Sequence, residues 1–193
     1  MKVQSMKKIQ RASTAVALPV ILTVILCALL ANTSYAATAK EIDTSVDVAL
    51  ERFHNDVKGG KEFLKNAKGV LVFPGVFKAG IGIGGEYGEG ALRINGKTVD
   101  YYNTAAASIG FQLGAQKKMV ILVFMADEAL KKFRASSGFE VGVDGSVALV
   151  ELGAGGTIDT TNIKSPIVAF IFGQKGLMYN LTLEGSKYTK IKK

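Results

Sequence analysis

The stretch that decides the fold spans residues 69–103 and reads GVLVFPGVFKAGIGIGGEYGEGALRINGKTVDYYN. Short β-branched and aromatic runs alternate with glycines, which indicates strands that bend or that another backbone segment approaches closely. Asn95-Gly96 lies between two alternating runs and is a strong signal for a two-residue hairpin. We therefore predict that this stretch forms an antiparallel sheet.

The same character continues toward the C-terminus, because 20 of the 22 glycines follow Gly60. Asp144-Gly145 is a second hairpin signal, and the run Val120–Met125 lacks polar alternation, so it predicts a strand buried on both faces. So many short strands predict an antiparallel barrel or a strongly curled sheet. Strands are predicted near residues 69–73, 78–85, 89–95, 98–103, 107–114, 118–125, 139–143, 146–151, 166–173, 176–183 and 186–191.

Helices are predicted at two places. Apolar residues spaced by three and four before Gly59-Gly60 indicate an amphipathic helix, which Thr38 and Glu41 begin with a capping box. Another turn or two follows over residues 61–67. Residues 127–136 have an acidic first turn and a basic end, which suit a helix. The predicted fold class is thus α+β and β-rich, with an N-terminal helix and one further helix.

Residues 1–36 have the pattern of a secretory signal. A basic start extends to Arg11, an apolar stretch follows, and the small residues Ser34 and Ala36 predict cleavage before Ala37. Two alternatives remain. The apolar stretch is about 20 residues long, enough to stay as a membrane anchor, and Cys27 is a candidate for lipidation although Leu26 precedes it. Cleavage would leave residues 37–193, a size typical of one domain.

Composition excludes several classes of protein. The chain is 48% hydrophobic, which argues against disorder, and its single Cys and single His exclude a disulfide framework and a Cys/His zinc site. The net charge of the chain is +8, and the leader holds four basic and no acidic residues. The remainder therefore carries 20 positive and 16 negative charges, or +4, an imbalance too weak to predict nucleic acid as a partner.

No motif supports catalysis or a cofactor. Residues 80–85 fit G-x-G-x-x-G, but no helix follows that could meet a pyrophosphate, so a glycine-bent strand is predicted. Residues 91–98 resemble a P-loop, yet their Asn-Gly predicts a hairpin with a solvated Lys97. His54 is interpreted as a structural or surface residue, and Glu86 and Glu89 as solvated residues on opposite strand faces. We predict no catalytic residue, no metal and no cofactor.

Two lysine-rich segments lie beside apolar or aromatic residues, as an anionic lipid surface requires. A solvated face that aids solubility is the other interpretation. The candidate lipid-binding residues are Lys58, Lys61, Phe63, Leu64, Lys65 and Lys68 in the first segment and Lys187, Lys190, Lys192 and Lys193 in the second.

Several blocks in order resemble the SYLF domain, also called the Ysc84-type lipid- and actin-binding domain. They are residues 67–74, 78–85 and 108–116, the helix around residues 129–133, and residues 175–185. The resemblance spans about residues 43–190. It departs from the family at residues 151–156, where members often carry a Gly-Pro turn.

The resemblance implies a single lipid-binding domain over residues 37–193. A secreted, stand-alone copy is similar to the bacterial envelope branch of the family, which argues against actin as a partner. We therefore expect a non-enzymatic, periplasmic or otherwise secreted protein that binds anionic phospholipid. The alternative is a structural or protein-interaction module of the envelope with a protein partner.

Overall fold

The computed structural model describes residues 37–152, 164–176, 183 and 185–193. Helix α2 (Ala39–Asp56) begins at the predicted capping box, in which the Thr38 side chain and Glu41 bond each other's backbone amides. Gly59 follows with φ 83°, a left-handed conformation that glycine adopts without steric cost, and α3 (Gly60–Lys65) begins directly after it. The predicted N-terminal helix and its break are confirmed.

One long antiparallel hairpin dominates the sheet. Its strands are β1 (Gly69–Ile94) and β2 (Lys97–Phe124), so six of the predicted short strands are in fact two long ones. The glycines bend these strands without ending them. Asn95 and Gly96 form the turn with φ 51° and 77°, as a two-residue hairpin requires, which confirms that prediction.

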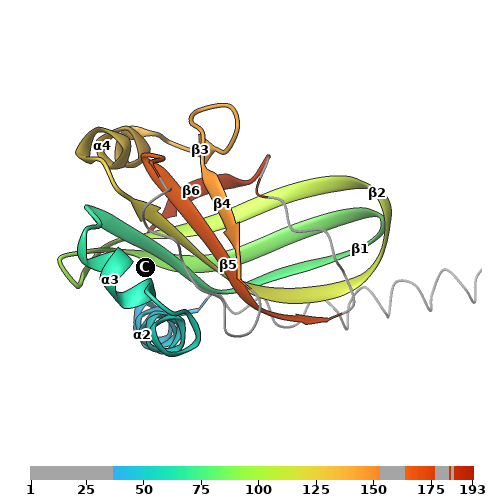
Figure 1. Cartoon of the computed structure of the whole chain (residues 1–193). Helices are drawn as coiled ribbons and strands as arrows, with labels where there is room; N and C mark the ends of the chain where they lie inside the picture. The colour runs from blue at the N-terminus through green and yellow to red at the C-terminus, as the bar shows by residue number, and fades with distance from the viewer. Residues whose placement is uncertain (1–36, 153–163, 177–182, 184) are drawn as a thin grey trace, which may run out of the picture. The chain divides into compact units, whose positions relative to one another are not determined.

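The hairpin folds back on itself at a bend near residues 80–84 of β1 (Figure 1). The pairing register shifts between Ile81 and Ile83, and a Cβ on Gly80 would lie 2.3 Å from the Cα of Gly84. Beyond the bend β1 returns against its own first half, where a Cβ on Gly90 would lie 2.1 Å from the carbonyl oxygen of Val72. The glycine-bent strand predicted for residues 80–85 is confirmed.

Four shorter strands complete the sheet of the described residues: β3 (Phe139–Glu140), β4 (Ala148–Glu151), β5 (Ile167–Gly176) and β6 (Lys187–Ile191). Their order is β3-β6-β2-β5-β4, with β1 on the free side of β2. All pairs are antiparallel except β4 with β5. The β-rich α+β class and the curled, mostly antiparallel sheet are thus confirmed, while most of the strand predicted at 176–183 lies outside the described residues.

The hairpin predicted at Asp144-Gly145 is wrong. Strand β3 pairs with β6 and β4 pairs with β5, so the two segments beside this turn do not pair with each other. Instead, the Glu140 amide donates to the Asp144 side chain, and Gly142 adopts φ 89°. The side chain of Asp144 therefore closes a local loop, which competes with a two-residue hairpin.

Apolar side chains pack on both faces of the sheet. Inside the curl, Leu71, Phe73 and Phe124 pack with Leu130 and Phe133 of α4 (Asp127–Ala135), the second predicted helix. On the outer face, α2 and α3 cover another cluster, which includes Ile42, Val46, Phe53, Phe63, Val72, Ile121, Val123 and Phe170. Residues 120–124 are buried in this double-sided core, as predicted for an uninterrupted apolar strand.

Candidate functional site

The outer face of the hairpin bend is apolar and uncovered. Through residues 77–87, the residues of β1 on the outward face are Phe, Ala, Ile, Ile, Gly and Tyr in turn. Phe77, Ile81 and Ile83 are 59%, 80% and 71% exposed. On β2, Ala105, Ala107 and Ala115 are exposed at paired positions. We call Phe77, Ile81, Ile83 and Tyr87, the large exposed members of this row, the apolar bend.

The inner face of the same segment is polar. Lys78, Glu86, Thr104, Gln116 and Lys118 are all buried there. An antiparallel sheet with one solvated face normally turns its apolar side chains inward and its polar ones outward. The bend reverses this arrangement, so its outward face is not that of an ordinary solvated sheet.

A buried ion pair anchors the polar interior. The Lys118 ammonium lies 3.0 Å from Glu86 Oε2, and the two side chains are 0% and 4% exposed. Burial and the nearby carboxylate of Glu86 raise the pKa of Tyr188, which is also enclosed by the curl. Within the part of the chain that the structure describes, Glu86 Oε1 and Gln116 Oε1 have no hydrogen-bond partner. The interpretation of Glu86 as a solvated residue is wrong, because the curl encloses it.

Cations border the apolar bend at the end nearer to α2. Lys117 places its ammonium 4.9 Å from the ring centroid of Phe77, a cation–π contact. Lys175 of β5 lies directly across from Lys117 in the strand pairing, and both lysines are exposed. Along the outward row of β1 from residue 77 to residue 87 there is no carboxylate. Apolar side chains and positive charge are therefore adjacent on this surface.

The first predicted lysine segment lies elsewhere, around α3. Lys65 pairs with Glu62 at 2.8 Å, and Lys68 lies 3.7 Å from Asp127. Phe63 is buried and Leu64 packs against the outer-face core, so these two side chains serve the core. Lys58 and Lys61 are exposed. Partial burial lowers the pKa of His54, and the nearby charge of Lys61 lowers it further.

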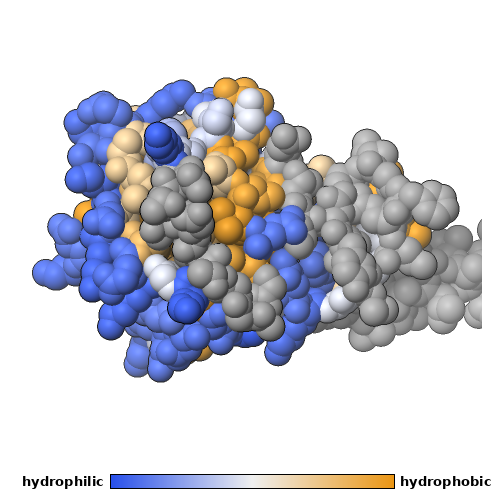
Figure 2. All heavy atoms as spheres, viewed as in Figure 1, coloured by the Kyte–Doolittle hydropathy of each residue, from blue (hydrophilic) through white to orange (hydrophobic). Residues whose placement is uncertain are grey.

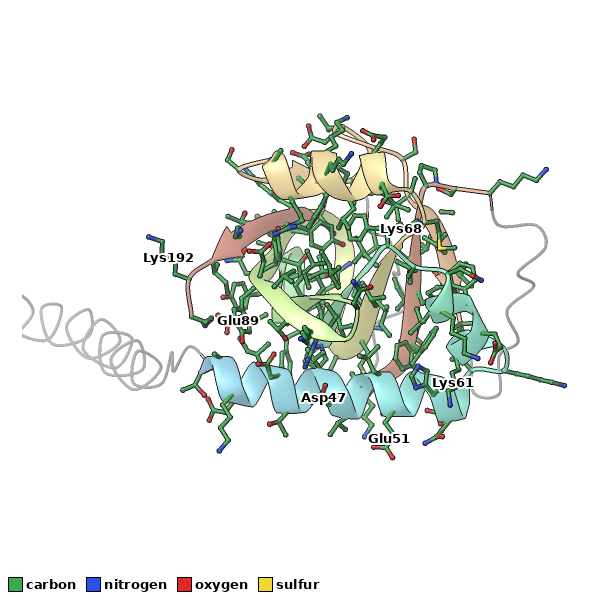
Figure 3. The ribbon with its side chains drawn as sticks, turned by 90° about the vertical axis from the view of Figure 1, so that its left-hand side faces the viewer. Asp47, Glu51, Lys61, Lys68, Glu89 and Lys192 are labelled. Carbon is green, nitrogen blue, oxygen red and sulfur yellow. The ribbon has the colours of Figure 1, made fainter. Side chains whose placement is uncertain are left out.

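The second predicted lysine segment is partly neutralised. Lys190 pairs with Asp100, which Arg134 also contacts at 3.0 Å, and Lys193 lies 2.9 Å from Glu89. Lys187 and Lys192 are exposed. Figure 3 shows Lys61 and Lys192 on opposite sides of the view, so the two predicted segments do not form one surface. Their roles in lipid binding stay a prediction.

Sequence reasoning missed the apolar bend. Its signal is present in the printed sequence, since every second residue from Phe77 to Tyr87 is apolar or glycine. The glycines between these residues predict a bent strand, but the pattern does not show which face of that strand is enclosed. Only the curl, which buries Lys78 and Glu86, identifies the apolar side as the exposed one.

Hydrophobic residues are also visible over β4 and β5, within a largely hydrophilic surface (Figure 2). No helix among the described residues is long and apolar enough to cross a membrane. No group of His, Cys, Asp and Glu side chains in the same residues is arranged to hold a metal ion.

Comparison with known proteins links the chain to one family. Residues 105–193 match the model of the Ysc84 family, described as Las17-binding protein actin regulator. The match begins within β2, near the bend, and extends through α4 and β3–β6 to the C-terminus. No curated protein matches the chain.

Proposed function

Given that the chain belongs to the Ysc84 family, which is known for lipid and actin binding, we propose that it binds anionic phospholipid membranes through the apolar bend. The role is one of binding, without catalysis. The protein acts in the cell envelope, where residues 1–36 direct it and are removed before Ala37. The intact mass of protein purified from cells measures this cleavage, and a dominant species that retains Met1 would indicate a retained anchor.

The observation that carries the proposal is the reversal of polarity at the bend. The outer face near residue 72 is covered by α2 and α3, but the same face is bare from Phe77 to Tyr87. Contiguous exposed apolar side chains mark surfaces that a partner covers. Ile81 and Ile83 lie next to the point where the strand turns back, so they project from an end of the sheet where a flat bilayer can receive them.

The neighbouring charges favour an anionic bilayer as that partner. Lys117 and Lys175 border the bend, and no carboxylate lies on the outward row of β1 from Phe77 to Tyr87. A lysine near an anionic surface contributes about 1 kcal/mol at moderate salt. Apolar insertion combined with such attraction is how interfacial segments bind membranes. A protein partner would require no such combination.

Vesicle flotation tests the proposal. We expect the full chain to float with vesicles that contain phosphatidylglycerol and to bind phosphatidylcholine vesicles much more weakly. Ile81→Asp and Ile83→Asp should each weaken binding by about tenfold, because the charged side chain cannot enter the acyl region. Binding should also decrease between 0.1 M and 1 M salt, where the Debye length falls from about 10 Å to about 3 Å.

Val143→Asp is the matched control. Val143 is 75% exposed but lies in the loop between β3 and β4, so the same substitution there should leave flotation unchanged. Equal loss at residues 81 and 143, or no binding to either kind of vesicle by a folded protein, would contradict the proposal. The second result would favour a protein-interaction module of the envelope.

A further inference from the structure

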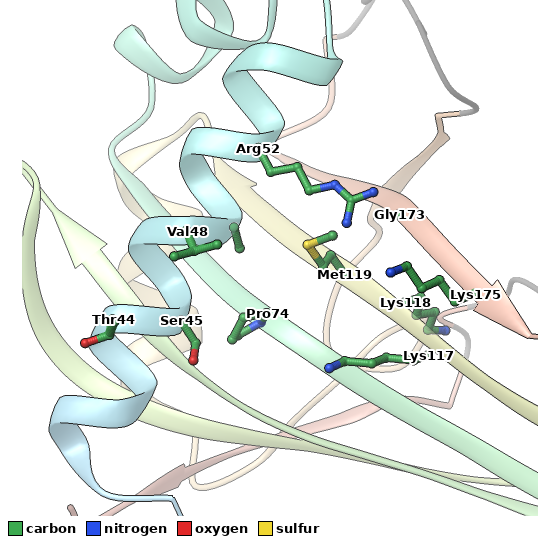
Figure 4. A pocket seen from close by; sticks show the side chains of 11 residues that line it. Thr44, Ser45, Val48, Arg52, Pro74, Lys117, Lys118, Met119, Gly173 and Lys175 are labelled. Carbon is green, nitrogen blue, oxygen red and sulfur yellow. The ribbon is translucent and has the colours of Figure 1, made fainter.

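A groove lies beside the apolar bend, between α2 and the strands that it crosses (Figure 4). Its volume is about 330 Å³, which is within the range of small-ligand sites. Helix α2 contributes Thr44, Ser45 and Arg52 to one wall. Lys117 of β2 and Lys175 of β5 lie on the other side.

The groove is positively charged and holds no carboxylate. Its lining includes Arg52, Lys117 and Lys175, and none of the residues that line it is Asp or Glu. Lys118 also borders the groove, but its ammonium is engaged by Glu86 inside the curl. Three cations therefore line the groove, and among the described residues the carboxylate that pairs with one of them is Asp56, which bonds Arg52 Nε at 2.9 Å.

Two of these cations are placed against each other. Lys117 and Lys175 are directly opposed in the antiparallel pair of β2 and β5, an arrangement that destabilises a sheet when the charges are alike. Neither lysine forms an ion pair among the described residues. An anion between them would remove this repulsion.

The backbone of β5 is shaped to keep the groove open. The β2–β5 register shifts between Lys117 and Met119, which leaves Gly173 and Gln174 opposite Lys118 alone. Gly173 has φ 63°, and a Cβ there would lie 2.3 Å from Met119 Cε and 3.4 Å from Arg52 Cζ. Such a bulge bends the strand locally, just before Lys175, and the glycine leaves room for the guanidinium of Arg52.

We propose that this groove binds a phosphomonoester that is the dianionic headgroup of a lipid such as phosphatidic acid. Arg52 has terminal amino groups that are free of the bond to Asp56, and a guanidinium binds phosphate oxygens in a bidentate manner. Lys117 and Lys175 supply the remaining charge, and Ser45 of α2 lines the same groove. The inference rests on the proposed function, because the acyl chains of the lipid would lie beside the apolar bend.

The test compares vesicles that contain phosphatidic acid with vesicles that contain phosphatidylglycerol at equal surface charge. The full chain should prefer phosphatidic acid. Arg52→Gln and Lys175→Gln should each reduce this preference by about fivefold, while Arg52→Lys should retain part of it. Lys97→Gln removes an exposed charge at the β1–β2 turn and is the matched control. Thermal melts establish that each variant is folded.

Soluble glycerol 3-phosphate, titrated by calorimetry, separates a lipid headgroup from free phosphate. Weak, saturable binding that Arg52→Gln abolishes and Ile81→Asp leaves intact supports the groove independently of the bend. Tight binding of glycerol 3-phosphate without preference for phosphatidic acid vesicles would overturn the lipid assignment. If Arg52→Gln and Lys175→Gln behave like Lys97→Gln, the proposal that the groove binds the phosphate is overturned. If these two variants no longer float while Ile81→Asp floats fully, membrane binding by the apolar bend is overturned and binding by the groove is retained.

Discussion

At the residue scale, glycine decides whether β1 can return against itself. Gly90 lies so close to the first half of the strand that an added Cβ would be 2.1 Å from the Val72 carbonyl oxygen and 2.8 Å from Phe73 Cδ1. The contact at Val72 is with backbone, which cannot move aside as a flexible side chain can. Gly85, by contrast, has open space around it.

These two glycines form a matched pair for mutation. Gly90→Ala should lower the free energy of unfolding by about 3 kcal/mol, because the added methyl forces the two halves of β1 apart. Gly85→Ala should change it by less than about 0.5 kcal/mol. Urea unfolding of both variants measures the difference. Equal stabilities would show that the halves of β1 are not in close contact.

The buried ion pair of Lys118 and Glu86 is a second feature of the fold that depends on single residues. Removing one partner leaves the other charge buried without compensation, so Lys118→Met should destabilise the fold by about 3–5 kcal/mol. The double variant Lys118→Met, Glu86→Leu should recover most of that loss, since neither charge of this pair is then left buried without the other. Denaturant unfolding of the single and double variants is the measurement. A double variant as unstable as the single one would contradict this explanation, because the loss of stability would then not come from the unpaired charge of Glu86.

At the element scale, the capping box fixes where α2 begins. Thr38→Ala should lower the free energy of unfolding by about 1 kcal/mol, because the helix loses the side-chain acceptor at its first turn. Thr44→Ala is the control, since Thr44 is exposed within the same helix and only bonds back to the Lys40 carbonyl. Thermal melts compare the two variants, and an equal change in both would argue against the cap.

The cap also has a pH dependence with a definite sign. Hydrogen bonds from the Thr38 backbone and side chain lower the pKa of Glu41 below its ordinary value of 4.5. A carboxyl group with a lowered pKa stabilises the folded state above that ordinary value and loses this effect as the pH falls through the lowered one. The difference in melting temperature between the parent chain and Thr38→Ala should therefore shrink in acid.

Elements also show how far sequence reasoning extends. The cap, the helix break and the Asn95-Gly96 turn depend on neighbours in the chain, so their residues predict them. Asp144-Gly145 has the same hairpin signal, but its flanking segments pair with β6 and β5, which are distant in sequence. Partner choice of this kind depends on the whole sheet, and a local turn signal does not contain it.

At the scale of the whole molecule, the curl determines which side of the bend is enclosed. The alternation of residue types along residues 77–87 is evident in the sequence. However, a buried lysine and an exposed isoleucine are the opposite of what side-chain polarity alone predicts. The site could therefore not be located from the sequence. The two lysine segments were predicted from the sequence, but several of their lysines form ion pairs with Glu62, Asp127, Asp100 and Glu89.

The most direct test of membrane binding by the bend uses a single environment-sensitive fluorophore. Cys27 is the only cysteine of the chain, so a Cys27→Ser background allows labelling of Ile83→Cys or of Val143→Cys alone. With phosphatidylglycerol vesicles, the label at residue 83 should shift to shorter wavelength and become protected from an aqueous quencher, while the label at residue 143 should not change. A chain that floats with the vesicles while the label at residue 83 stays fully accessible to the quencher would contradict the account.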